Sequence, residues 1–375
     1  MDLRLSEEQE LIKAAAREFL EVECPMSHVR EMEADATGYS AEIWRKMAAL
    51  GWMGVAFPEA YGGLGNGFLD LCLLIEEMGR VRLPSPFLPT VVLGGMPILH
   101  YGSDEQKAEY LPAIAAGHRI LTYAELEPGT GWGAHDLGCV ATPDGDGLVL
   151  SGTKIFVPYA SAADDLLVVA RSEGAAGRKL TLLLVDATSD GITCEPLETV
   201  GYDHLERVTF EGVRVDSSRV LVGVMEGRPI VEAIGRWGSA ARCAEMLGGA
   251  DRVLEMTLDY AKERHQFGCP IGSFQAVQHH CANMAIDVLG SRFITYEAIW
   301  CLDEGLDASG IVSMAKAWTG GAYRRVCSLG HQIHGAIGYT REHDLHLYFR
   351  HATASDLAFG DIDYHCEQVA QQLGL

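Results

Sequence analysis

The sequence predicts a mostly helical protein with a β domain in the middle of the chain. Three observations support this order. Apolar residues recur with helical spacing near the start, short runs rich in Val and Leu fill the middle, and helical spacing then returns. We therefore expect three domains, at residues 1–118, 119–225 and 226–375.

The first region carries clear signals for the start of a helix. Ser6 followed by Gln9 forms a capping box, and apolar residues then recur with helical period from Leu11 to Phe19. Ser103 followed by Gln106 repeats the same signal. The proline-rich stretch at residues 84–89 should break the helical pattern between them.

The middle region has a different pattern. Short runs of Val and Leu occur at residues 148–150, 166–170, 180–185 and 208–215, and residues 144–147 read as a turn between two strands. Nothing here resembles a strand–helix–strand unit. An antiparallel barrel or sandwich is therefore predicted, not a doubly wound parallel sheet.

The last region is helical again and should form a bundle. One apolar stripe runs from Leu247 to Ala261, and Ile286, Leu289 and Phe293 continue the pattern further along. We expect these stripes to face the core of the bundle.

Composition excludes several classes of function. The 375 residues carry a formal net charge of −23 and no cluster of Lys and Arg, so a nucleic-acid partner is not expected. No apolar run reaches membrane-spanning length and no signal segment opens the chain, which favours a cytoplasmic protein without membrane contact. The 10 cysteines show neither a CxxC pair nor a zinc spacing, so we expect reduced thiols and no metal site.

Two segments contain residues suited to a phosphate-bearing ligand. They are RHQFGCPIGSFQ at residues 264–275 and QIHGAIGYT at residues 332–340. Arg264 offers a planar fork of donors that matches pyrophosphate oxygens. Gly335 lets a backbone approach a ligand closely, and Gln332 can bond sugar or phosphate oxygens without adding charge.

These segments, together with YAELEPGTG at residues 123–131, resemble signatures of the acyl-CoA dehydrogenase family. The first is similar to R-x-Q-F-G-x-P-I-x-x-F-Q, the second to Q-x-H-G-G-x-G-Y and the third to Y-x-x-T-E-P-x-x-G. The resemblance implies an N-terminal helical domain, a middle β-barrel and a C-terminal four-helix bundle. It also implies FAD as cofactor and desaturation of an acyl-CoA, in which a carboxylate removes the α-proton and flavin N5 accepts a hydride.

The resemblance assigns the residues that hold the adenosine-diphosphate part of FAD. We call this set the dinucleotide grip: Arg264, Gln266, Phe267, Gly268, Phe274, Gln275, Gln332, His334 and Gly335.

The part of the pattern that surrounds the flavin ring is not kept. Leu126 and Pro158 stand where the family has Thr residues that bond the ring, and Trp132 stands where it has Ser. Pro158 has neither a hydroxyl nor a backbone N–H to offer. The chain has therefore lost most of its hydrogen bonds to a flavin ring.

The expected base is also absent. In the family a Glu occupies one of two positions, which here hold Phe359 and Gly238, and neither residue can accept a proton. Two carboxylates lie nearby in the sequence. Glu245 is on the helical face of Gly238, and Asp361 follows Phe359 in a turn-like stretch.

Three hypotheses remain open at this point. The chain is the non-catalytic companion in a heteromeric α2β2 acyl-CoA dehydrogenase like those of actinobacterial steroid side-chain degradation. Alternatively, it is a self-sufficient homotetramer in which Glu245 or Asp361 is a relocated base. The third possibility is a non-enzymatic scaffold with the same fold. The resemblance implies an acyl-CoA substrate and electron-transfer flavoprotein as electron acceptor in either enzymatic case.

Overall fold

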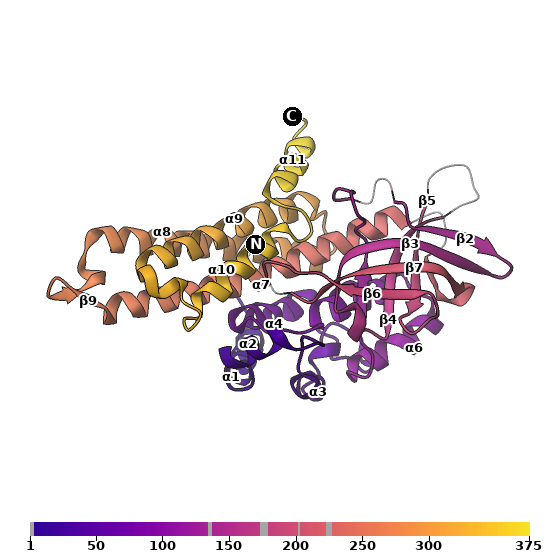
Figure 1. Cartoon of the computed structure of the whole chain (residues 1–375), viewed down its shortest axis with the longest axis horizontal. Helices are drawn as coiled ribbons and strands as arrows, with labels where there is room; N and C mark the ends of the chain where they lie inside the picture. The colour runs from indigo at the N-terminus through magenta and orange to yellow at the C-terminus, as the bar shows by residue number, and fades with distance from the viewer. Residues whose placement is uncertain (1–3, 134–136, 173–178, 202, 223–226) are drawn as a thin grey trace.

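The computed structural model describes residues 4–133, 137–172, 179–201, 203–222 and 227–375. Figure 1 shows a long molecule in which the β domain lies at the right and the tip of a helical bundle lies at the left. The N-terminal helices lie below the bundle in this view. The expected order of helical, β and helical regions is confirmed.

Six α-helices make up the described part of the N-terminal region. They are α1 (Glu7–Glu23), α2 (Met26–Ala34), α3 (Ala41–Ala49), α4 (Phe68–Val81), α5 (Met96–Tyr101) and α6 (Asp104–Ala115). The capping boxes of Ser6 with Gln9 and of Ser103 with Gln106 are both present. The predicted proline break is shorter than expected, because a π-helical segment, η3 (Leu88–Gly95), starts within it.

The β domain is built on one eight-stranded sheet in the order β6-β7-β3-β2-β4-β5-β8, with β1 beside β4. The strands are β1 (Leu121–Ala124), β2 (Val140–Asp144), β3 (Gly147–Pro158), β4 (Asp165–Ser172), β5 (Lys179–Asp186), β6 (Ile192–Pro196), β7 (Leu205–Asp216) and β8 (Val220–Val222). Most neighbouring strands are antiparallel, and the predicted turn joins β2 to β3. The prediction was wrong for β4, which runs parallel to both β1 and β2.

The C-terminal bundle contains long helices that leave the β domain. They are α7 (Gly227–Glu263), α8 (Gln275–Asp303), α9 (Ser309–His334), α10 (Leu345–Leu357) and α11 (Ile362–Gln372). A small hairpin of β9 (His265–Gln266) and β10 (Cys269–Pro270) joins α7 to α8, and a 3-10 turn, η7 (Gly335–Tyr339), follows α9. No described helix combines the length and apolar character that a membrane crossing requires.

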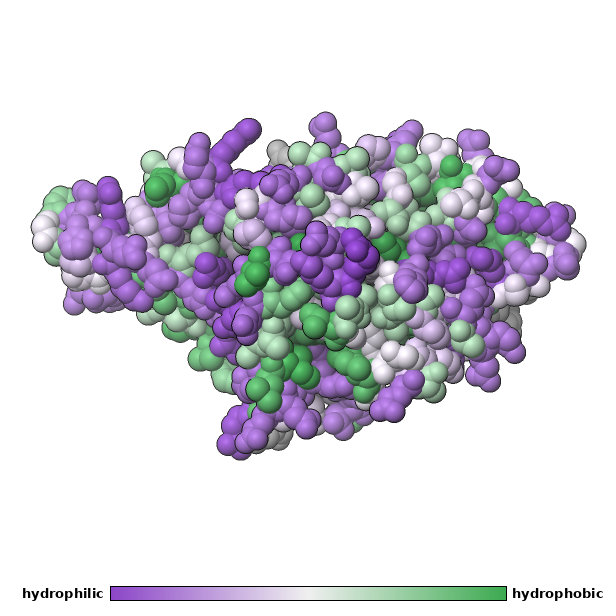
Figure 2. All heavy atoms as spheres, turned by 90° about the horizontal axis from the view of Figure 1, so that it is seen from below, coloured by the Kyte–Doolittle hydropathy of each residue, from purple (hydrophilic) through white to green (hydrophobic). Residues whose placement is uncertain are grey.

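The apolar stripe of α8 does not face the bundle core as expected. Ile286, Leu289 and Phe293 are 63%, 49% and 51% exposed, whereas Met284 and Val288 point inward. The helix therefore presents a row of apolar side chains on the surface of this chain. In the face shown in Figure 2, hydrophobic residues gather mainly near the middle.

Glycines allow α4 and α7 to touch through their backbones. A Cβ atom added to Gly248 of α7 would lie 1.8 Å from the carbonyl oxygen of Glu76, and one added to Gly79 of α4 would lie 2.0 Å from that of Glu245. No side chain fits at these points. The contact fixes the N-terminal helices against the middle of α7.

We predict that Gly248→Ala lowers the free energy of unfolding by about 3 kcal/mol, because the new methyl group forces the two helices apart. Gly235→Ala on the same helix is the matched control, since a Cβ atom there meets nothing within 4 Å. This second change should raise stability by about 0.5 to 1 kcal/mol through helix propensity. Urea denaturation of both variants measures the difference, and equal effects would contradict the proposed helix contact.

Candidate functional site

The residues singled out from the sequence fall into two groups at different places on α7. The dinucleotide grip begins at Arg264, directly after α7 ends, next to the β9 hairpin at the left tip in Figure 1. Gly238 and Glu245 lie in the first half of α7, close to the β domain. At a rise of about 1.5 Å per residue, the helix carries Arg264 about 28 Å beyond Glu245.

The hairpin of the dinucleotide grip holds an aromatic ring out into solvent. Gln266 pairs with Cys269, so Phe267 and Gly268 form a two-residue turn in which φ is +55° and +85°. Asn-Gly is the preferred residue pair in such a turn, because both positions have positive φ. A Phe in the left-handed region costs about 1 to 2 kcal/mol of conformational free energy. Phe267 is nevertheless 93% exposed, with its ring edge-to-face with that of Phe274 at 6.0 Å. The hairpin thus holds an aromatic ring in solvent despite the cost of its backbone conformation.

His334 joins the two segments of the dinucleotide grip. It is buried, its Nδ1 donates to the carbonyl oxygen of Gly330 at 2.8 Å, and its ring stacks on Tyr260 of α7 with centroids 4.4 Å apart. Burial lowers the pKa of His334, so the neutral ring is favoured. In this chain His334 packs α9 against α7, and direct contact between it and a dinucleotide remains a prediction.

The polar groups of the dinucleotide grip are free to bind. The side chains of Arg264, Gln266, Gln275 and Gln332 are exposed. Among the described residues, the Arg264 guanidinium has no hydrogen-bond or ion-pair partner. Gly335 takes a φ of +66°, and a Cβ atom there would meet nothing within 4 Å. A free guanidinium beside exposed amides and an open backbone fits the adenosine-diphosphate end of FAD.

Glu245 of the second group lines a cavity of about 590 Å³ where the β domain, the N-terminal helices, α7 and α10 meet. We call it the central cavity. Four residues flagged from the sequence lie in its wall, although they are distant along the chain: Leu126, Trp132, Pro158 and Phe359. The structure thus brings together the positions at which the flavin-ring pattern and the base were lost.

The two possible base positions meet in space. A Cβ atom on Gly238 would lie 2.5 Å from the ring of Phe359, so the aromatic side chain fills the room that a residue on α7 would need. Two hydrogen bonds to backbone carbonyls fix the chain around Phe359. His365 Nε2 donates to the carbonyl of Phe359 at 3.0 Å, and the buried Lys316 ammonium donates to the carbonyl of Gly360 at 2.9 Å. The backbone that carries the ring is therefore held in place, and neither Phe359 nor Gly238 offers a carboxylate.

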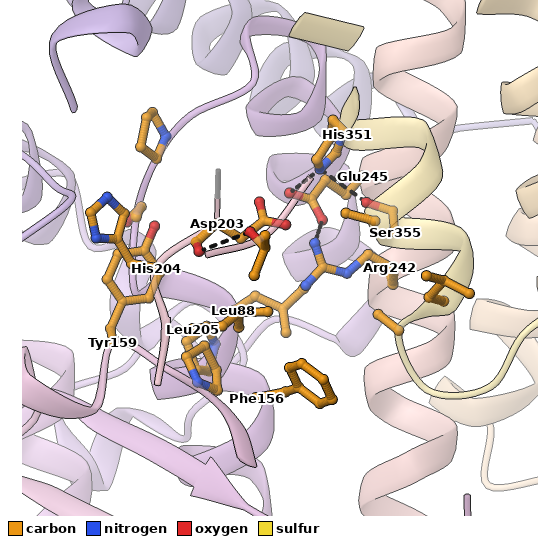
Figure 3. A pocket seen from close by; sticks show the side chains of 18 of the residues that line it. Leu88, Phe156, Tyr159, Asp203, His204, Leu205, Arg242, Glu245, His351 and Ser355 are labelled. Carbon is orange, nitrogen blue, oxygen red and sulfur yellow. Dashed lines mark hydrogen bonds and ion pairs between the residues drawn. The ribbon is translucent and has the colours of Figure 1, made fainter. Parts of the chain in front are cut away.

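Glu245 lies on the wall of the central cavity inside an ionic cluster (Figure 3). Its carboxylate pairs with Arg242 on the same helix and lies 3.4 Å from Nε2 of His351 on α10. Ser355 Oγ lies 3.0 Å from the same nitrogen. Although burial opposes ionisation, the charges of Arg242 and His351 lower the pKa of Glu245 to about 2. A carboxylate with so low a pKa is a weak proton acceptor.

Asp361 occupies a structural position. It is the N-cap of α11, where its carboxylate accepts from the backbone N–H of Tyr364 at 2.9 Å. It is not among the residues that line the central cavity. Both fallback carboxylates therefore have structural partners, and the geometry disfavours each of them as a base.

Sequence reasoning assigned no role to one buried ion pair that shapes the cavity wall. Lys154 is fully buried, and its ammonium donates to the Glu127 carboxylate at 2.7 Å and to the backbone carbonyl of Glu125 at 2.8 Å. Glu127 also accepts from the backbone N–H of Cys139 at 3.0 Å. A signal was present for Glu127, which matches the Glu of the Y-x-x-T-E-P signature although Leu126 beside it departs from that signature. The pair keeps the backbone of this wall in place.

Comparison with known proteins agrees with this arrangement along the whole chain. Three models of the acyl-CoA dehydrogenase family match it: the N-terminal domain at residues 6–118, the middle domain at 122–213 and the C-terminal domain at 227–374. The acyl-CoA dehydrogenase FadE27 of Mycobacterium tuberculosis is 30% identical over 381 residues, which cover 100% of this chain and 99% of that protein.

Two solved structures share the fold closely. A chain of the ChsE4–ChsE5 complex from Mycobacterium tuberculosis has a TM-score of 0.91 and 30% identity, covering 100% of this chain and 99% of its own. A variant of the Tcur3481–Tcur3483 steroid ACAD has a TM-score of 0.89 and 32% identity, covering 98% of each chain. This chain therefore belongs to the acyl-CoA dehydrogenase family, whose members are FAD-dependent oxidoreductases that act on CH–CH bonds.

Proposed function

We propose that this chain is the non-catalytic companion subunit of a heteromeric acyl-CoA dehydrogenase. Its dinucleotide grip holds the adenosine-diphosphate end of an FAD whose ring lies in a partner subunit. The partner supplies the glutamate base and the intact ring pocket. The observation that carries this proposal is that Phe359 and Gly238, which occupy the two base positions, pack against each other. Neither position has a carboxylate, whereas the polar side chains of the dinucleotide grip are exposed.

The position of the dinucleotide grip supports a cofactor shared between chains. It lies at the tip of the bundle, about 28 Å along α7 from Glu245 in the wall of the central cavity. Bound FAD supplies a hydride acceptor. This chain's own residues contribute Arg264, which neutralises pyrophosphate charge, and the exposed ring of Phe267, which offers an apolar face.

The surface of the bundle supports assembly with another chain. The exposed row of Ile286, Leu289 and Phe293 on α8 buries apolar area only when a second protein covers it. The names of two solved structures support a heteromer, since one is a ChsE4-ChsE5 complex and the other is a Tcur3481-Tcur3483 steroid ACAD. We accordingly propose an acyl-CoA with a bulky, steroid-like acyl group as substrate and electron-transfer flavoprotein as acceptor.

The relocated-base hypothesis is the second candidate, and its residues are Glu245 and Asp361. The ion pair of Glu245 with Arg242 and the capping role of Asp361 count against it. The scaffold hypothesis conflicts with the free guanidinium and the strained, exposed ring of the dinucleotide grip.

We predict that the full-length chain alone binds little FAD, whereas its complex with a partner acyl-CoA dehydrogenase chain carries one FAD per pair of chains. In that complex Arg264→Ala should weaken FAD binding about 10- to 100-fold, because a charge-assisted contact to phosphate is lost. Lys262→Ala is the matched control, since Lys262 is exposed and pairs only with Asp259 among the described residues. Visible absorbance and flavin titration measure both variants. Full FAD occupancy and turnover in the chain by itself would refute the proposal.

Glu245→Gln tests whether this carboxylate is structural. The pKa of Glu245 is about 2 in the folded protein, which is below its value in the unfolded chain. The contribution of its charge to folding stability is therefore fully present above the unfolded pKa and is lost as the pH falls towards 2. We expect the variant to lose about 2 to 3 kcal/mol of unfolding free energy at pH 7, and the loss to fade between about pH 5 and pH 2. The control is Glu42→Gln in the exposed pair with Lys46, which should change stability little.

The activity of variants at Glu245 and Asp361 distinguishes the companion hypothesis from the relocated-base hypothesis. In the assembled complex, Glu245→Gln and Asp361→Asn should each retain dehydrogenation of acyl-CoA, measured by reduction of an artificial electron acceptor. Loss of turnover in either variant, with FAD still bound and the complex intact, would favour a relocated base.

A further inference from the structure

Tyr260 of α7 lies outside the dinucleotide grip but contacts both of its segments. It is one helical turn before Arg264, whose backbone N–H donates to the Tyr260 carbonyl at 2.8 Å. On its other side the Tyr260 ring stacks on that of His334 at the end of α9, with centroids 4.4 Å apart and an angle of 20° between the ring planes. Arg264 begins the first segment and His334 belongs to the second, so this tyrosine joins the two.

The hydroxyl of Tyr260 also reaches the backbone of the second segment. It donates to the carbonyl oxygen of His334 at 3.4 Å, which is long for an O–H donor, so the ring stack is the stronger of the two contacts. The N–H of the same peptide unit belongs to Gly335 and donates to the carbonyl oxygen of His331. Both polar groups of this peptide unit therefore have partners, which fixes its orientation.

The peptide unit that Tyr260 contacts comes directly before the turn of the second segment. At Gly335 the backbone leaves α9 with a φ of +66° and a ψ of −142°, a conformation that glycine adopts readily and other residues rarely do. A Cβ atom on Gly335 would meet nothing within 4 Å, so the backbone is open to a ligand here. Rotation of the preceding peptide unit would move this open backbone relative to Arg264.

A second stack of a tyrosine on a histidine holds the turn after Gly335. His331 is 2% exposed, and its ring stacks on that of Tyr339 with centroids 4.4 Å apart and an angle of 23°. A Cβ atom on Gly338 would lie 3.1 Å from His331 Nδ1 and equally close to His334 Cβ, so η7 packs directly on the two histidines. Tyr339 belongs to η7 itself, whereas Tyr260 ties the turn to the helix that leads into the first segment.

We infer that Tyr260 is a positioning residue for FAD, because its stack on His334 sets the spacing and orientation of the two segments that bind the adenosine-diphosphate end. Two segments from different elements bind one ligand more tightly when their arrangement is fixed beforehand, since ordering them during binding costs conformational entropy. The inference rests on the proposed function of the dinucleotide grip and adds to it a residue that acts through His334.

The test measures FAD binding by the full-length chain in complex with its partner acyl-CoA dehydrogenase chain. Tyr260→Leu removes the stack and the hydroxyl, and should weaken FAD binding about tenfold in a flavin fluorescence titration. Tyr260→Phe keeps the stack and should weaken binding only about two- to threefold. Turnover at saturating FAD should stay unchanged in both variants, because the flavin ring and the base lie in the partner subunit.

Hydrogen exchange of the chain by itself gives a readout that needs no FAD. In Tyr260→Leu the amides of η7 should exchange about tenfold faster while those of α8 stay unchanged, because only the turn loses a contact. Tyr101→Leu is the matched control, since Tyr101 is 37% exposed and lies beside the ring of His100 on α5, in the N-terminal region. This control should leave both FAD affinity and the exchange of η7 as they are.

Arg264→Ala in the same complex separates failure of this inference from failure of the proposed function. If Arg264→Ala weakens FAD binding and Tyr260→Leu does not, the positioning role is refuted and the dinucleotide grip stands. If neither change affects FAD binding, the proposed function and this inference both fail. Equal losses of affinity in Tyr260→Phe and Tyr260→Leu, or faster exchange in α8 as well as η7, would also overturn the inference, because the stack would then not be the cause.

Discussion

The rest of the structure depends on the position of α7. This helix is 37 residues long and runs from the β domain to the β9 hairpin. Its first half lines the central cavity and its end leads into Arg264. Backbone contact with α4 at Gly79 and Gly248 fixes the helix against the N-terminal region. Because a helix of this length is stiff, the cavity and the dinucleotide grip stay far apart within this chain, as the proposed sharing of one dinucleotide between two chains requires.

The central cavity shows how the site could lose its base without losing its shape. The ring of Phe359 packs against Gly238, so an aromatic residue and a glycine complement each other where the family carries a carboxylate. Glu245 lies nearby, but its interactions with Arg242 and His351 lower its affinity for a proton. A stable ion pair and a good general base place opposite demands on one carboxylate, since attraction that holds the charge also lowers the pKa.

The chain keeps the fold of the family although the positions around the flavin ring depart from the family pattern. The buried pair of Lys154 and Glu127 holds the cavity wall whether or not a flavin ring lies against it. The positions that would have bonded the ring hold Leu126 and Pro158, which leave the backbone arrangement intact. The chain combines a largely apolar cavity with a dinucleotide grip in which the Arg264 guanidinium has no partner among the described residues.

The sequence by itself determined the order of the domains, the caps of α1 and α6, and the family, because these depend on local periodicity and contiguous motifs. It also identified Leu126, Trp132, Pro158 and Phe359 as departures, since each lies inside or beside a recognisable segment. Sequence periodicity was misleading for α8, where an apolar row reads as core although Ile286 and Phe293 face outward. A periodic pattern marks an apolar face and does not show whether that face packs within the chain.

Only the tertiary structure decided which groups meet. The contact of Phe359 with Gly238, the stacking of His334 on Tyr260 and the pairing of Glu245 with Arg242 and His351 join different elements or depend on the depth of burial. The pKa of Glu245 depends on the same surroundings. Such properties arise from distances and from the removal of water, which exist only once the chain is folded.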